Sequence, residues 1–430
     1  MKRGVLVTLM TIFIPWFLQA QNTPNDTQNL SLEDAVNFAM KYNKQLQASQ
    51  MEIELRKKMI TEAIAQGLPQ VNGSLNYSTN FKYEMNFGGN AITMKDQSNL
   101  GVSVSQLIFN GEWIIGIQSS NLAKKIAEQQ VDATELDIKE TVYNSYFTVL
   151  VSERLMEIVK GNLNNMNEIL KHTENMYNEG AAEITDVEQI KITVGQLKNS
   201  LLSMERTVDV SYNLLRLQLG IPAGTPLTLT DPLESFLTEE VPLKLANQPF
   251  NIQSNIQYQL MKSQEEVQQK MVKLKKWAYA PTISANYNYT HKLLKPDLDM
   301  SPKHSAAITM SIPVFSGLKR KAQLDQEKIK LEQTQLNKNL LEDQLNLQEE
   351  QYKFTLKNAI ENYNLQKENI QVAKKVLENY QNKYNAGVVS SLDLTQANNN
   401  YLNAENNYTS ACLTLLQAKI QLEKLHNTLK

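Results

Sequence analysis

Cysteine is almost missing from this chain. Cys412 is the one cysteine among 430 residues. No disulfide can therefore form within the chain, and no cluster of cysteines can bind a metal. Histidine is scarce as well, with four widely separated residues: His172, His291, His304 and His426. We therefore expect no metal site and no cofactor.

An excess of basic charge is also missing. The chain has 43 Lys and Arg residues against 45 Asp and Glu, for a formal net charge of −2. That balance gives no electrostatic footprint for nucleic acid, so no nucleic-acid partner is expected. The sequence contains no P-loop, no dinucleotide fingerprint, no nucleophile elbow and no HExxH zinc motif. We therefore predict no catalytic residues, and a secreted enzyme is disfavoured.

Proline is absent from two long stretches, residues 113–221 and the segment from 314 to the C-terminus. Because proline breaks a helix interior, its absence permits very long helices there. Long apolar runs are missing after residue 20, so no transmembrane helix is predicted. Hydropathy does not exclude a transmembrane β-barrel, since barrel strands alternate polar and apolar residues.

The N-terminus has the pattern of an export signal. Met1-Lys2-Arg3 precede an apolar run over residues 5–18, and Gln-Ala-Gln follows at 19–21. A basic start, a short apolar core and a small residue before a polar segment are typical of a cleaved signal peptide. We predict a signal peptide at 1–20. An uncleaved membrane anchor is the alternative.

One motif occurs twice. Residues 177–189 read Tyr-Asn-Glu-Gly-Ala-Ala-Glu-Ile-Thr-Asp-Val-Glu-Gln, and residues 384–396 read Tyr-Asn-Ala-Gly-Val-Val-Ser-Ser-Leu-Asp-Leu-Thr-Gln. The Tyr, Gly, Asp, aliphatic and Gln positions recur in register, which indicates one structural unit used twice. We expect a first repeat over 21–220, a proline-rich linker over 221–250 and a second repeat over 251–430.

Each copy of the motif lies between two helical patterns. Apolar or small residues recur at alternating steps of three and four after each motif, which is typical of a coiled-coil seam. We predict long helical hairpins over about 112–219 and 317–427. Gly180 and Gly387 stand at their tips, where glycine supplies the left-handed conformation that ends a helix. Asp186 and Asp393 then fall in the first turn of each returning helix, where a carboxylate favours the helix dipole.

Shorter helices are predicted ahead of each hairpin. The first covers residues 32–65, after a capping-box pair of Ser31 and Asp34. The second covers residues 251–277. Each short helix leads into a pair of strands.

The period then changes to two, at about 70–109 and 281–315. Valine, leucine, isoleucine and tyrosine alternate there with uncharged Asn, Ser and Thr, which predicts four strands with one apolar and one polar face. Loops are expected over about 80–99 and 291–305. An apolar outer face and a polar inner face suit a transmembrane barrel. Four strands cannot close a barrel, so several chains would have to share one. A small soluble sheet is the alternative.

This order of elements resembles the TolC family of trimeric outer-membrane efflux channels. The resemblance rests on the duplicated turn motif, the strand entries at Pro69 and Pro281, and the strand exits Phe-Asn-Gly at 109–111 and Phe-Ser-Gly at 315–317. It implies a mainly α fold with a small β part: twelve strands from three chains in an outer-membrane β-barrel, and a periplasmic α-barrel of coiled-coil hairpins. It also implies an internal two-fold repeat.

The resemblance further implies roles at the hairpin tips. Asp393 matches an acidic position that lines the constriction of the channel, and Asp186 is its counterpart in the first repeat. Gln396 stands where well-known members carry a second acid. The docking positions for a periplasmic adaptor fall on Gly180, Ala181, Gly387 and Val388. Stabilisation of a helix start is the alternative role for both aspartates, and the two roles are compatible.

The predicted function is a passive exit duct in the outer membrane of a Gram-negative bacterium, extending into the periplasm. Its implied partners are two further copies of the chain, outer-membrane lipid, an adaptor that opens the tips, and an inner-membrane pump of the RND or ABC type. The duct would serve a tripartite efflux or type I secretion system. The alternative is an exported periplasmic coiled-coil adaptor or scaffold.

Overall fold

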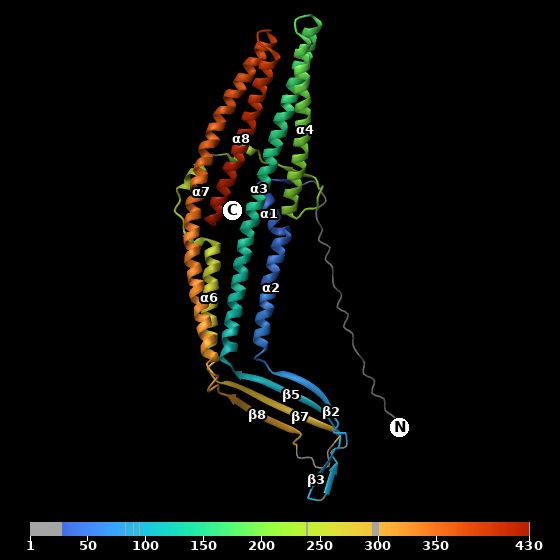
Figure 1. Ribbon diagram of the computed structural model, residues 1–430, viewed down its shortest axis with the longest axis vertical. Coiled ribbons are helices and arrows are strands. Elements are labelled where there is room, and N and C mark those ends of the chain that lie inside the picture. The colour runs from blue at the N-terminus through green and yellow to red at the C-terminus, as the bar shows by residue number, and fades with distance from the viewer. Residues whose placement is uncertain are drawn as a thin grey trace, which may run out of the picture.

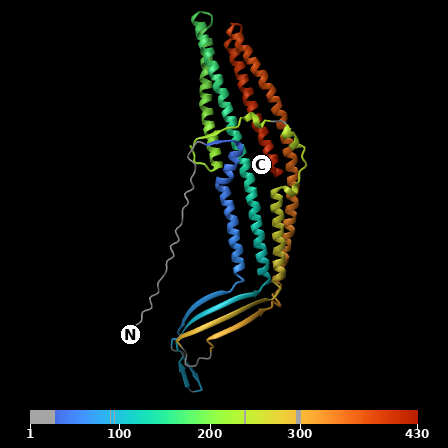
Figure 2. The ribbon, with the colours of Figure 1, turned by 180° about the vertical axis from the view of Figure 1, so that it is seen from behind.

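The computed structural model describes residues 28–81, 83–88, 90–93, 95–237, 240–294 and 301–429. The predicted signal peptide, 1–20, lies outside these residues. The molecule is elongated, with a sheet at one end, the tips of two helical hairpins at the other, and parallel helices between them (Figure 1). The view from behind shows the same arrangement (Figure 2).

The order of elements is the same in both halves, as the repeated motif predicts. The first half contains α1 (Leu32–Tyr42), α2 (Lys44–Ala65), β2 (Gln70–Ser78), β5 (Gln97–Phe109), α3 (Gly111–Asn178) and α4 (Ile184–Leu219). The second half contains α6 (Ile256–Trp277), β7 (Thr282–Leu294), β8 (His304–Ser311), α7 (Lys319–Asn385) and α8 (Ser391–Leu425).

The four predicted strands form one antiparallel sheet in the order β2-β5-β7-β8. Val104 of β5 lies opposite both Val71 of β2 and Tyr287 of β7. Ala285 of β7 lies opposite Ile308 of β8. The register therefore collects the apolar side chains on one face, because side chains alternate along every strand. The sheet is open, and β2 and β8 are its two edges.

Several short elements were not predicted. The expected loop over 80–99 contains a hairpin of β3 (Glu84–Phe87) and β4 (Asn90–Thr93). The linker contributes β6 (Leu227–Leu229), which pairs in parallel with β1 (Gln28–Leu30). It also contains η1 (Leu233–Phe236) and α5 (Glu240–Ala246), and η2 (Ile252–Ser254) follows. Elements of three or four residues are too short to show a period in the sequence.

The single helix predicted over 32–65 was wrong, because the chain breaks at Asn43. The Asn43 side chain accepts hydrogen bonds from the backbone of Gln45 and Leu46, at 2.9 and 3.2 Å, and so caps α2. Its Nδ2 donates to the carbonyl of Gln218 at the end of α4, at 2.7 Å. The helix α2 therefore stacks end to end on α4.

The second half repeats this arrangement, and the helix predicted over 251–277 begins only at Ile256. Asn255 caps α6 and donates from Nδ2 to the carbonyl of Leu425 in α8, at 2.9 Å. We call these two stacked ends the helix junctions. They place α4 above α2 and α8 above α6, while α3 and α7 run past both levels without a break (Figure 1).

Three apolar clusters hold the helices together. Two lie near the helix junctions, one around Tyr146 and one around Leu356. The third, which we call the tip cluster, joins the two hairpins near their ends and includes Met166, Ile190 and Leu394. No helix among the described residues is both long and apolar enough to cross a membrane.

Candidate functional site

Both hairpin tips have the same turn. Gly180 and Gly387 have φ values of +77° and +71°, in the left-handed region that glycine adopts without strain. The next amides, Ala181 and Val388, donate back to carbonyls of the outgoing helix, at 2.8 and 2.9 Å. This pattern satisfies carbonyl groups that a helix end would otherwise leave free. The chain therefore reverses at the two predicted glycines.

Asp393 caps its own helix. Its carboxylate accepts from the Ser390 hydroxyl at 2.7 Å and from the Ser390 backbone at 3.1 Å, and its backbone donates to the Ser390 hydroxyl at 3.2 Å. The hydrogen bond from the Ser390 side chain, together with that from its backbone, lowers the pKa of Asp393. The carboxylate therefore stays charged at neutral pH, on an exposed side chain.

Asp186 does more than begin a helix. Its Oδ2 accepts from the backbone of Glu183 at 3.3 Å, as a capping carboxylate does. Its Oδ1 accepts from the hydroxyl of Ser391 at 2.5 Å, and Ser391 belongs to the other hairpin. Ser391 is buried. The two predicted aspartates are therefore unequal: Asp393 bonds within its own turn, whereas Asp186 links α4 to α8.

A second polar contact joins the hairpins at this level. The Tyr384 hydroxyl and the Thr173 hydroxyl lie 2.8 Å apart, between α7 and α3, and both side chains are buried. Burial raises the pKa of Tyr384, so its hydroxyl keeps its proton. Tyr177, the matching tyrosine of the first motif, is 44% exposed. We call the Asp186–Ser391 and Thr173–Tyr384 pairs the cross-hairpin bonds.

Sequence reasoning missed the partners in these bonds. Tyr384 belongs to the repeated motif, so the motif was the available signal, but nothing local distinguishes it from Tyr177. Ser391 and Thr173 carry no signal of their own, because their partners are about 200 residues away in the chain.

Next to the tip cluster, α8 buries polar groups that have no hydrogen-bond partner. Asn398 of α8 is completely buried, and neither atom of its amide is hydrogen-bonded. Glu405 of the same helix accepts from Tyr401 at 2.6 Å through Oε1, while its buried Oε2 has no partner. A buried polar group left unpaired costs about 1–3 kcal/mol. Burial of this part of α8 is therefore less favourable than burial of apolar side chains alone.

The predicted docking residues lie on the surface. Gly180, Ala181 and Gly387 are exposed, and the Val388 side chain is 70% exposed. Gln396 is exposed too, and it donates to Asn400 of its own helix at 3.0 Å. The tips thus present small and apolar side chains to solvent, and none of the other described residues covers them.

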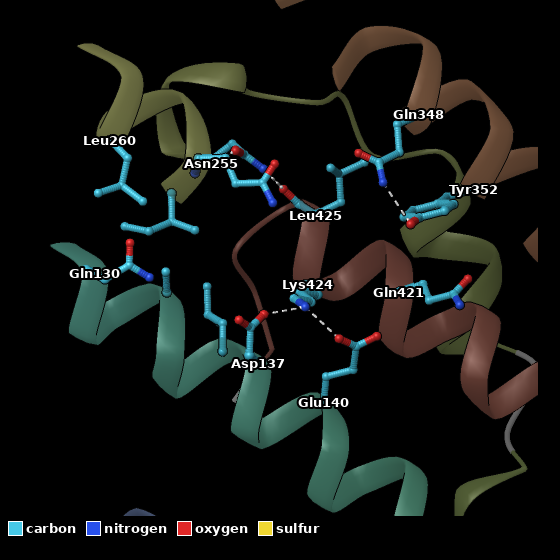
Figure 3. Close-up of a pocket in the computed structure, with 14 residues that line it drawn as sticks. Gln130, Asp137, Glu140, Asn255, Leu260, Gln348, Tyr352, Gln421, Lys424 and Leu425 are labelled. Carbon is cyan, nitrogen blue, oxygen red and sulfur yellow. Dashed lines mark hydrogen bonds and ion pairs between the residues drawn. The ribbon is translucent and has the colours of Figure 1, made fainter. Parts of the chain in front are cut away.

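A pocket of about 340 Å³ lies at the junction of α8 and α6, bordered by α3 and α7. Figure 3 shows Lys424 pointing from α8 toward Asp137 and Glu140 of α3, which accept from its Nζ at 2.6 Å each. Burial lowers the pKa of Lys424, but the hydrogen bonds to Asp137 and Glu140 outweigh burial and raise it. The charged trio joins the two repeats across this pocket.

Other reactive groups are buried or scattered. Burial raises the pKa of Cys412 to about 11, so this thiol is inert at neutral pH. Across the described ranges, no three His, Cys, Asp or Glu side chains come together in a way that could hold a metal.

Comparison with known proteins identifies the family. The sequence model of the outer membrane efflux protein family matches residues 36–221 and 253–428. The probable efflux pump outer membrane protein TtgC of Pseudomonas putida is 23% identical over 355 residues, which cover 78% of this chain and 70% of TtgC. The match therefore includes both repeats.

Solved structures show the same fold. The CmeC outer membrane channel of Campylobacter jejuni superposes with a TM-score of 0.75 and 15% identity, over 92% of this chain and 85% of CmeC. The MtrE outer membrane channel of Neisseria gonorrhoeae gives a TM-score of 0.74 and 18% identity, over 93% of this chain and 89% of MtrE.

CmeC and MtrE are outer membrane channels, and TtgC is an outer membrane protein of a probable efflux pump. The predicted mainly α fold, the place in the outer membrane and the role in efflux are confirmed at the level of the family. The adaptor alternative has no support among the matches. The chain therefore belongs to the outer membrane efflux protein family.

Proposed function

We propose that three copies of this chain form one passive duct, with twelve strands closing a barrel in the outer membrane and the helices forming a tube through the periplasm. The observation that carries the proposal is the open sheet. Both edge strands, β2 and β8, are exposed along their whole length. Unpaired edges with apolar side chains are prone to pair with another chain, and joining β8 of one copy to β2 of the next removes every edge.

The distribution of side chains supports the same assembly. The apolar face of the sheet carries large exposed residues, while its other face carries Asn, Ser and Thr. In a closed barrel the first face contacts lipid and the second lines a wet pore. The apolar face includes Val71, Leu75, Val102, Tyr287, Ile308 and Met310.

The hairpin tips act as the gate in this proposal. Breaking the cross-hairpin bonds would let the hairpins separate, and water would then solvate Asn398 and Glu405. In this proposal the unpaired polar groups of α8 beside the tip cluster lower the free-energy cost of that separation. A periplasmic adaptor that binds the exposed tips at Ala181 and Val388 would shift the equilibrium only by its preference for the separated arrangement.

In this proposal the duct is passive, so the energy for transport would come from an inner-membrane pump of the RND or ABC type. TtgC is described as part of an efflux pump, and we propose the same kind of tripartite partnership here. A type I secretion system is the other assembly with which such a duct could work.

Size and conductance in planar bilayers test the proposal. Purified protein should run as a trimer in detergent and form small, cation-selective channels. The double variant Asp186→Ala, Asp393→Ala should raise the conductance, because it removes two carboxylates and one cross-hairpin bond at the tips. The variant Asp209→Ala, an exposed acid on α4 away from the tip, is the control and should behave as wild type.

A further variant separates the bond from the charge. Ser391→Ala removes the hydrogen bond to Asp186 and leaves every charge in place. A rise in conductance with Ser391→Ala shows that the bond itself restrains the gate. A monomer in detergent, or a trimer with no conductance in any variant, would refute the duct.

A further inference from the structure

The strand-to-helix connection of the second repeat carries a dense group of cations. We call this group the basic collar: three residues at the end of α6 and three at the start of α7, namely Lys273, Lys275, Lys276, Lys319, Arg320 and Lys321. Four of them are exposed in the single chain, and Lys275 and Arg320 are half-buried. Within the part of the chain that the structure describes, none of the six forms an ion pair with a carboxylate.

The matching connection of the first repeat has no such group. There α2 ends in Thr-Glu-Ala-Ile-Ala, and α3 begins with Gly-Glu-Trp. The first cation of α3 is Lys124, more than three turns into the helix. Because the two connections share one fold, the fold alone does not require the basic collar. Lys275 lies close enough to the Glu327 carboxylate of α7 to lower its pKa, and the other five cations repel one another unless an anion lies nearby.

The basic collar lies where the apolar face of the sheet ends. The exposed apolar row of β8 continues beyond the strand through Ile312 to Val314, which is 91% exposed, and the first cation follows five residues later. Trp277 lies at the same level, with its ring 6.3 Å from that of Phe109. Tryptophan and tyrosine gather where a membrane meets water. This level is therefore the periplasmic boundary of the outer membrane, given the membrane position proposed above.

Arg320 is held in place at this boundary. Its guanidinium donates to the carbonyl of Pro313 at 2.8 Å and lies 5.6 Å from the centre of the Tyr279 ring. Two contacts fix the direction of the side chain and leave most of its five donors unused. A guanidinium with free donors matches the oxygens of a phosphate, and nearby lysines add attraction for anionic lipid.

We infer that the basic collar binds the phosphate headgroups of anionic phospholipids in the periplasmic leaflet of the outer membrane. The exposed apolar residues before it, Val314, Phe315 and Leu318, would lie among the acyl chains next to the same headgroups. The assignment rests on the proposed membrane position of the sheet. It goes beyond the duct, because it assigns a lipid site to the strand-to-helix connection of the second repeat and none to that of the first.

Retention of lipid by purified protein tests the inference. The collar variant changes the four exposed lysines to glutamine: Lys273, Lys276, Lys319 and Lys321. A matched control removes four exposed lysines from the hairpins, far from the sheet: Lys160, Lys198, Lys374 and Lys375. Both variants and the wild type are reconstituted in nanodiscs of phosphatidylglycerol and phosphatidylcholine, re-extracted in mild detergent, and the bound lipid is counted by native mass spectrometry.

We expect the collar variant to retain at least threefold less phosphatidylglycerol than the wild type, with phosphatidylcholine unchanged and the control variant equal to the wild type. Inorganic phosphate at millimolar concentration should not displace the lipid, since it lacks acyl chains. Equal retention by the collar variant and the wild type would overturn the inference, and so would an equal loss in the control. Displacement by phosphate alone would assign the site to a free anion instead.

Conductance separates this inference from the duct. The collar variant should still assemble as a trimer and conduct as the wild type does. If its ion selectivity changes while lipid retention does not, the cations line the tunnel and the lipid site is wrong. If the trimer falls apart, the basic collar is a subunit contact and the inference fails. Absence of conductance in the wild type would refute the duct, whatever lipid is retained.

Discussion

The two hairpin turns are built alike and used differently. Both reverse at a left-handed glycine and both place an aspartate in the first turn of the returning helix. In the second turn the carboxylate of Asp393 accepts a hydrogen bond from the nearby Ser390 hydroxyl. In the first, Asp186 reaches across to Ser391. The two copies of the motif therefore form the same backbone turn, while the matching aspartates make different hydrogen bonds.

The same divergence appears at the lower ends of the hairpins. At this end of the first repeat, Val142 of α3 and Leu219 of α4 are fully buried beside Tyr146. At the matching positions of the second repeat, Glu349 and His426 are buried with their polar atoms 3.7 Å apart, and Lys353 pairs with Glu349. At these matching positions one end has aliphatic and phenol side chains and the other has a carboxylate, an imidazole and an ammonium group, although the backbone is the same.

The largest change in stability should come from placing a residue of the second end at the matching position of the first. Leu219→His places an imidazole in the apolar end of the first repeat, where no carboxylate replaces Glu349. Loss of a fully buried leucine and burial of an unpaired polar ring together should cost about 3–5 kcal/mol. Denaturant unfolding in detergent measures the change. A cost below about 1 kcal/mol would mean that the two ends are more alike than their residues indicate.

The motif tyrosines should differ next most. Tyr384→Phe removes the buried hydrogen bond to Thr173 and should weaken the contact between hairpins by about 1 kcal/mol. Tyr177→Phe changes an exposed side chain and should have no measurable effect. Single-channel recording should show more frequent opening for Tyr384→Phe alone. The same response from both variants would remove the distinction between the tips.

Acid should affect the second repeat more than the first. Burial lowers the pKa of His426, and the charge of Glu349 only partly offsets it. The unfolded chain then binds a proton more readily than the folded one. The free energy of unfolding is therefore not reduced by His426 above a pH of about 6.5. It decreases as pH falls below that value, by at most about 1.4 kcal/mol per pH unit.

The variant His426→Leu copies the first repeat and tests this sign. Its thermal midpoint should change less between pH 7 and pH 5 than that of the wild type. Lys353 and Glu349 face His426 from α7, so Glu349→Gln serves as the second variant. A wild type whose stability rises on acidification would contradict the assignment to His426.

The two repeats should differ least in the stability cost of replacing their turn glycines. Neither Gly180 nor Gly387 has another group near the position of a Cβ atom, so only the positive φ opposes a side chain. Gly180→Ala and Gly387→Ala should each cost about 1–2 kcal/mol, and the two costs should agree. Unfolding of both variants under one condition checks this. A clear inequality would show that the two turns are not equivalent even in backbone.

Much of this architecture follows from local patterns. The strands were predictable because each face carries one kind of side chain, as Val102 and Ser103 illustrate. The hairpins were predictable because their seams repeat over many turns and glycine marks the reversal. Both signals lie within a few residues of the structure they specify.

What the sequence did not reveal depends on distant partners. The break at Asn43 is fixed by the Gln218 carbonyl, 175 residues away, and no proline or glycine marks it. The use of Asp186 depends on Ser391, 205 residues away. Lining the constriction and stabilising a helix start were the two roles predicted for that aspartate, and the bond to the other hairpin was not predicted, since it depends on how the hairpins lie side by side.

In the proposed tube, the helix junctions should make the wall unevenly stiff. Two long helices, α3 with 68 residues and α7 with 67, are continuous. The columns beside them are interrupted, that of α2 and α4 at Asn43 and that of α6 and α8 at Asn255. We expect bending to concentrate at the level of the helix junctions, where two of the four helical columns of each chain are interrupted. From that level, α4 extends as a lever of roughly 54 Å, so each degree of rotation moves the tip by roughly 1 Å. The sheet lies on the other side of the joint, where it can stay still while the tips move.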